Sequence, residues 1–191
     1  HHALVPTRAV NITLQYDDHE LQPALDSTIA WHELLTELSA GGTFWLTTID
    51  PAGGPHTRPV FAVQAAGSVF VASSRTAAKS PALHAGGEVS VATSRPAIDI
   101  IWSGTSRHVT DPGRLDAVAD AYRSTYGWEV TVADGALTAP YGAPTAGPPP
   151  YDVFDIAPRA VHAIGTDAPF IGRSTRWSGH TPTDRASQPV A

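Results

Sequence analysis

The spacing of apolar residues along the chain separates helical stretches from strand-like ones. Between Trp31 and Leu38, apolar residues recur at i, i+3, i+4 and i+7, which is the spacing of one helical face. Gly41–Gly42 then supply a helix end. The same spacing returns over 113–126, directly after Asp111–Pro112, a pair typical of a helix start. We therefore expect a helix in each of these two places.

Between and after these helices the period falls to two, which is typical of strands. Short turns with Gly and Pro separate the alternating segments. The segments that we expect to be strands are 44–49, 55–64, 68–73, 88–93, 98–110, 151–157 and 160–165. Pro55 and Pro59 favour an edge position for the second of them, and Gly104 favours a bend in the fifth. This order predicts an all-β fold, a six- to seven-stranded antiparallel barrel with flanking α-helices.

The remaining segments predict one domain with loose ends. Residues 1–27 lack a steady period and read as an N-terminal arm, in which His1–His2 resembles an affinity-tag remnant. Residues 28–177 form the expected barrel domain, and 178–191 a flexible tail. Residues 127–150 are expected to form a long loop, and loops of this length are often functional.

Composition excludes several classes of protein. The chain has 191 residues, no cysteine and a net charge of −6, so we expect neither a disulfide framework nor nucleic acid as a partner. No apolar run reaches the length of a membrane helix, and no signal peptide is recognisable, so we expect no membrane partner and a cytoplasmic protein.

Familiar catalytic motifs are missing. His32–Glu33 begins like a zinc-protease helix, but the second histidine is absent because position 36 is Thr. We find no serine-hydrolase elbow and no dinucleotide-binding glycine motif, and the scattered histidines predict no metal site. Conventional acid–base or nucleophilic catalysis is therefore not indicated.

Basic and hydroxyl residues do gather in two predicted strand regions. Arg58 lies in the strand HTRPV with His56, and the stretch SSRTAAK after the third strand carries Arg75 and Lys79. Lys79 is the single lysine of the chain. Cations next to hydroxyls and free N–H groups suit a phosphate, although a solvated surface lysine would look the same in sequence.

An ordered set of segments resembles the FMN-binding split-barrel proteins related to pyridoxamine 5′-phosphate oxidase, and most of all an actinobacterial branch with deazaflavin-dependent reductases. The segments are WHELL (31–35), FWLTT (44–48), GGPHTRPV (53–60), VFVASSRTAAKSPAL (69–83), EVSVAT (88–93), WSGTSRHVTD (102–111), AYRSTYGW (121–128), YGAPTAGPPPYDVFDIAP (141–158) and TRW (175–177). The resemblance implies a split β-barrel that forms a homodimer, with FMN or a 5-deazaflavin coenzyme of the F-420 type in a groove between subunits.

The resemblance also implies which residues hold the cofactor. A strand corresponding to 56–60 would run along the ring, and cations of that strand and of the following basic turn would hold a phosphate. The residues implicated are His56, Thr57, Arg58, Pro59, Val60, Ser73, Ser74, Arg75, Thr76 and Lys79, with Trp177 reaching in from the neighbouring chain. Tyr141, in the long loop, is the expected polar contact to the substrate. The turn departs from the family at Ala82, where the family has Asn.

These features lead to two expected functions and a weaker third. The first is an oxidoreductase that transfers a hydride between a reduced flavin or deazaflavin and a small unsaturated substrate. The second is a non-catalytic flavin- or haem-binding split-barrel protein, an option that the change at Ala82 keeps open. The third, a pyridoxamine 5′-phosphate oxidase proper, lacks recognisable residues for its substrate phosphate.

Overall fold

The computed structural model describes residues 5–8, 28–142 and 147–178 and consists mostly of antiparallel strands. Most of the expected arm (1–27) and tail (178–191) lies outside the described residues. The strands are β1 (Val5–Arg8), β2 (Phe44–Ile49), β3 (Pro55–Val60), β4 (Ala62–Ala65), β5 (Ser68–Ser74), β6 (Glu88–Arg95), β7 (Ile98–Val109), β8 (Thr131–Ala133), β9 (Ala136–Thr138), β10 (Tyr151–Gly165) and β11 (Ser174–Ser178). The helices are α1 (Trp31–Ser39), α2 (Ser80–His84) and α3 (Pro112–Tyr126). In these segments no helix is long and apolar enough to cross a membrane.

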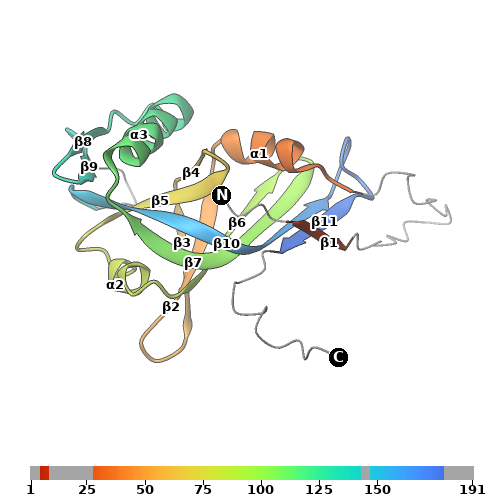
Figure 1. Ribbon diagram of the computed structural model, residues 1–191, viewed down its shortest axis with the longest axis horizontal. Coiled ribbons are helices and arrows are strands. Elements are labelled where there is room, and N and C mark those ends of the chain that lie inside the picture. The colour runs from red at the N-terminus through yellow and green to blue at the C-terminus, as the bar shows by residue number, and fades with distance from the viewer. Residues whose placement is uncertain (1–4, 9–27, 143–146, 179–191) are drawn as a thin grey trace, which may run out of the picture.

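The strands form one branched sheet, and all their pairs are antiparallel. Its main path runs β1-β11-β10-β7-β6-β2-β3. The long strand β10 pairs with β7 from Val153 to Gly165, while its other edge pairs first with β5 and then with β11 (Figure 1). The expected antiparallel barrel with flanking helices is confirmed. The described residues contain more strands than the six or seven expected.

The extra strands have local causes. The expected strand 55–64 is divided at Phe61 into β3 and β4, which pair with different neighbours. Residues 131–138, expected to lie in a long loop, form the hairpin β8–β9, which pairs with the start of β10 through Leu137. Leu137 and the nearby Trp128 are buried against α3, so this half of the expected loop is a fixed part of the core.

The expected edge position of the strand with Pro59 is confirmed, whereas the irregularity expected at Gly104 falls on the neighbouring strand. β3 ends the main path of the sheet, so the missing N–H of Pro59 costs no bond to a further strand. Gly104 lies opposite a register shift between Pro158 and Ala160, so the irregularity is on β10 and not on β7, where a bend was expected. A Cβ atom at position 104 would lie 1.9 Å from the carbonyl oxygen of Ala157, so the close approach of the two strands requires glycine.

Two apolar cores hold the molecule together. The first lies under α1, where Leu34 and Leu38 pack on the inner face of the sheet around Trp102. The second lies under α3, where the buried Leu115 and Tyr122 face the start of β10. The basic residues singled out from sequence lie where β3 faces the turn between β5 and α2.

Candidate functional site

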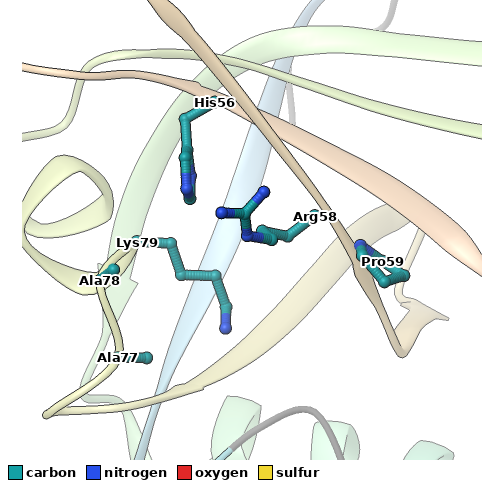
Figure 2. A pocket seen from close by; sticks show the side chains of 6 residues that line it. All are labelled: His56, Arg58, Pro59, Ala77, Ala78 and Lys79. Atoms are coloured by element: carbon teal, nitrogen blue, oxygen red, sulfur yellow. The ribbon is translucent and has the colours of Figure 1, made fainter.

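A cavity of about 250 Å³ lies between β3 and the turn that joins β5 to α2. Figure 2 shows side chains from both walls pointing into it. The residues that line it are His56, Arg58, Pro59, Ala77, Ala78 and Lys79. The structure thus brings together four of the predicted cofactor residues, His56, Arg58, Pro59 and Lys79, from segments about twenty positions apart.

The β3 wall follows from the sheet register. Arg58 pairs with Leu46, and His56 pairs with Thr48, both of which are buried side chains of the inner face. Residues directly opposite in a sheet share a face, so Arg58 and His56 point inward as well. Because β3 is the last strand of the main path, these inward side chains border an opening. Arg58 is exposed there, and its guanidinium donates to the carbonyl oxygen of Thr57.

Lys79 faces Arg58 from the opposite wall and is 7% exposed (Figure 2). Within the described ranges its ammonium has no hydrogen bond or ion pair. Burial lowers the pKa of Lys79 below the ordinary value of 10.5, because a charged amine loses hydration without gaining a counter-ion. Such a group is stabilised by an incoming anion.

Hydroxyl groups fix the turn that carries Lys79. Ser73 Oγ lies 2.8 Å from Ser80 Oγ, and Ser80 Oγ donates to the Ser74 carbonyl oxygen at 2.6 Å. Ser74 Oγ contacts Thr76 Oγ1 at 3.1 Å, while the Ala77 N–H donates to the Ser74 carbonyl oxygen. Ser73 and Ser74 are buried and bonded within the turn. They therefore position the turn and are not among the residues that line the cavity.

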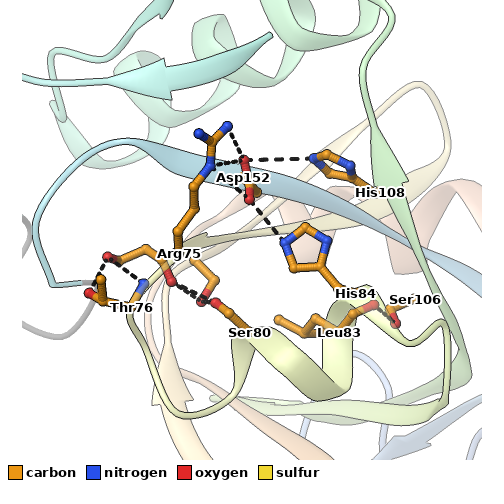
Figure 3. Close-up of polar contacts among 10 residues, drawn as sticks. Arg75, Thr76, Ser80, Leu83, His84, Ser106, His108 and Asp152 are labelled. Carbon is orange, nitrogen blue, oxygen red and sulfur yellow. Dashed lines mark hydrogen bonds and ion pairs between the residues drawn. The ribbon is translucent and has the colours of Figure 1, made fainter. Parts of the chain in front are cut away.

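Arg75 points away from this cavity. Its Nη2 lies 2.9 Å from Asp152 Oδ1, and its Nε donates to the same carboxylate at 3.0 Å (Figure 3). His84 Nε2 lies 3.0 Å from Asp152 Oδ2, and His108 Nε2 lies 3.7 Å from Oδ1. Arg75 also lines a second cavity, of about 300 Å³, beside the β8–β9 hairpin. Arg75 is thus tied to a carboxylate on β10.

Asp152 is the residue that sequence reasoning missed. Its side chain is 3% exposed. Burial by itself raises the pKa of Asp152, but the hydrogen bond and charge of Arg75, together with His84 and His108, hold that pKa below the ordinary 3.8. A carboxylate inside the apolar run YDVFDI was the available signal, because a buried charge needs a partner.

Four other predicted residues also lie apart from the cavity. Thr57 is on the outer face, where its hydroxyl contacts Thr47 Oγ1 at 2.9 Å. Val60 is buried in the first core, and Thr76 is exposed and bonded to Ser74. Tyr141 is 54% exposed and lines neither described cavity.

Trp177 is packed inside its own chain. It is 3% exposed, and its ring lies 5.3 Å from that of Trp31, which in turn lies 5.6 Å from Trp102. The prediction that Trp177 reaches a groove on a neighbouring chain does not agree with this burial, since the ring is used to join α1 to the sheet. We leave Trp177 out of the proposed site.

Comparison with known proteins agrees with this architecture. The family model described as pyridoxamine 5′-phosphate oxidase matches residues 30–165. The chain therefore belongs to the pyridoxamine 5′-phosphate oxidase family of split-barrel proteins. A comparison with curated proteins gives no significant match.

Solved structures share the fold at low sequence identity. An FMN-binding protein related to pyridoxamine 5′-phosphate oxidase from Nostoc punctiforme is 14% identical, with a TM-score of 0.50, over 80% of this chain and 87% of that one. A heme binding protein from Mycobacterium smegmatis is 16% identical, with a TM-score of 0.54, over 79% and 59%. An FAD binding protein from the same organism is 12% identical, with a TM-score of 0.50, over 72% and 98%. At these identities the likeness extends to the fold.

Proposed function

We propose that the chain binds a flavin-type cofactor, FMN or a 5-deazaflavin of the F-420 type, by placing its phosphate between Arg58 and Lys79. The observation that supports this most is the pair of cations facing one cavity, one of them buried without a counter-ion in the described residues. A phosphate would give Lys79 the charge partner that it lacks and would accept hydrogen bonds from both side chains.

The size of the cavity limits what it can hold. About 250 Å³ is below the range of roughly 300–1,000 Å³ that encloses a drug-sized ligand, so the cavity suits the phosphate end of the cofactor. The ring would lie outside, along β3, where Pro59 borders the cavity. A second wall is then needed to keep water away from the ring.

We propose that a second copy of the chain supplies this wall. Trp45 is opposite Pro59 on the outer face and is 51% exposed. Through Ala92, Trp45 is aligned across the sheet with Ile101, which is 38% exposed. Large apolar side chains in a row on an open sheet face favour association. We expect Trp45→Arg to convert a dimer to a monomer in sedimentation experiments, whereas a monomeric unaltered protein would contradict the homodimer.

The activity that we propose is hydride transfer to a small unsaturated substrate. The cofactor supplies the redox chemistry, and the chain supplies a phosphate site and a partly apolar surface. Tyr141 stays our candidate for a polar contact to the substrate, as an exposed phenol near the end of the described range 28–142.

Absorption spectra and titrations test the binding step directly. We expect FMN or the deazaflavin to bind, and the bound chromophore to bleach with a reductant and recover with an acceptor. Binding without recovery by any unsaturated acceptor would favour the non-catalytic alternative. Failure of both cofactors to bind would contradict the proposal.

A second candidate, haem binding, is favoured by one observation. His56 is half-buried in the same cavity, and in the described ranges no hydrogen bond engages its imidazole. A free imidazole beside two cations suits an iron ligand next to haem propionates. A Soret band after addition of haemin, lost in His56→Ala, would support this candidate over the flavin.

A further inference from the structure

Lys79 has a second chemical property besides its charge. An amine with its proton removed is a nucleophile that adds to aldehydes, and enzymes obtain such lysines by desolvating them. Lys79 is 7% exposed, faces an open cavity and has no charge partner within the described ranges. Burial lowers its pKa, so the neutral amine is populated at lower pH than for a solvated lysine.

The opposite wall carries the groups that would hold an anionic aldehyde. Arg58 points at Lys79 across the cavity, and a guanidinium binds phosphate through paired N–H donors (Figure 2). His56 lies in the same cavity, and an imidazole can both donate and accept a hydrogen bond through its ring nitrogens. The cavity of about 250 Å³ has room for a small sugar phosphate beside these side chains.

We propose that Lys79 is a covalent capture site for small aldehydes that carry a phosphate group, in the protein without its cofactor. The inference uses the cavity of the proposed function but does not require that a flavin binds there. It goes beyond phosphate binding, because it assigns the lysine a bond-forming reaction.

The reaction balances without an oxidant or a reductant. The Nζ lone pair forms a bond to the aldehyde carbon, and the carbonyl oxygen takes up a proton. The resulting hydroxyl takes up a second proton and leaves as water. The nitrogen loses two protons in all, so the neutral amine and the aldehyde give an imine and one water. His56 is the group in the cavity that can pass the proton to the departing oxygen. Arg58 holds the phosphate during these steps.

The sequence makes the test unusually clear, because Lys79 is the single lysine of the chain. The cofactor-free protein is incubated with glyceraldehyde 3-phosphate, treated with borohydride to fix any imine, and examined by intact mass and peptide mapping. Glyceraldehyde is the matched probe without phosphate. The α-amino group of the first residue is the internal reference for ordinary amine reactivity.

We expect one adduct at Lys79. It should form about tenfold or more faster with the phosphorylated aldehyde than with glyceraldehyde, because one charge-assisted hydrogen bond to phosphate has an effect of this size. Inorganic phosphate should slow the formation of this adduct. Arg58→Leu should keep the adduct but lose the preference for phosphate. Lys79→Arg keeps the positive charge without the nucleophile and should give no adduct beyond the α-amino group.

Equal labelling of Lys79 and the α-amino group by both aldehydes would overturn the proposal, as would no labelling of Lys79. Titration of the same preparation with FMN and with the deazaflavin separates this outcome from the proposed function. FMN binding without an adduct removes the capture site and leaves the cofactor site. An adduct without binding of either cofactor removes the cofactor site and leaves the capture site.

Discussion

Arg75 and Lys79 lie four residues apart on one turn, yet the structure uses their charges in opposite ways. The Arg75 side chain is 53% exposed but is held by the buried carboxylate of Asp152. Lys79 is 7% exposed and has no charge partner in the described residues. The exposed fraction of a basic side chain therefore does not show whether its charge is free to bind an anion. The exposed cation is already satisfied, and the buried one is available to an anion.

The first prediction tests the contrast between Arg75 and Lys79 by removing the carboxylate of Asp152. We expect Asp152→Ala to lower the free energy of unfolding by about 2–3 kcal/mol, because charged hydrogen bonds from Arg75 and His84 lose their acceptor. The loss stays below that of a fully buried pair, since both partners are partly exposed and can turn to water. Urea unfolding measures it, with the exposed Asp116→Ala as control. Equal midpoints for the two variants would mean that Asp152 does not anchor the turn.

The second is to truncate each cation in turn and measure the affinity for FMN. Lys79→Ala should weaken binding by about 1–3 kcal/mol, the scale of a charged hydrogen bond. Arg75→Ala should change it by about 0.5 kcal/mol or less, as for a residue outside the site. Calorimetric titration gives both values. A larger loss for Arg75 than for Lys79 would reverse the assignment.

The third prediction concerns how much the buried, unpaired charge of Lys79 destabilises the cofactor-free protein. Lys79→Met keeps the length of the side chain and removes the charge, so the cofactor-free protein should become more stable by about 1 kcal/mol. Denaturant midpoints of the two proteins provide the measurement. A less stable variant would show that Lys79 contributes a favourable interaction in the folded protein.

The fourth uses pH. The folded protein has a lowered pKa for Lys79, while the unfolded chain keeps about 10.5, so the unfolded state binds more protons between these values. The penalty of the buried charge is therefore full below the folded pKa and is relieved as pH rises through this window. The advantage of Lys79→Met should shrink over the same range, and FMN affinity of the unaltered protein should fall. An advantage constant with pH would contradict the lowered pKa.

Local sequence patterns were enough for α1, α3 and the strands β2 to β7, because capping and periodicity act over a few residues. The helix α3 begins at the Pro of Asp111–Pro112, and Pro59 lies on the edge strand, as expected. The pattern did not reveal that 131–138 pairs with β10, since that hairpin is stabilised by burial against α3, not by its own sequence.

The candidate site was predictable in part, because some of its residues lie in segments that can be recognised locally in the sequence. Arg58 and Lys79 were found because each lies in a recognisable segment, and the antiparallel fold brings those segments together. The roles of Arg75 and Trp177 depend on partners far away in the sequence. Asp152 is 77 positions beyond Arg75, and Trp31 lies at the other end of the domain from Trp177. Pairings at such distances are set by the register of β10 and by core packing, which short motifs do not encode.

The most direct measurement is a cycle in which the phosphate of the ligand and the amine of Lys79 are removed separately and together. Binding of FMN and of riboflavin, which lacks the phosphate, is measured for the unaltered protein and for Lys79→Ala. We expect Lys79→Ala to weaken FMN binding by about 1–3 kcal/mol and to leave riboflavin binding unchanged. Equal losses for both ligands, or none for FMN, would show that Lys79 does not hold the phosphate.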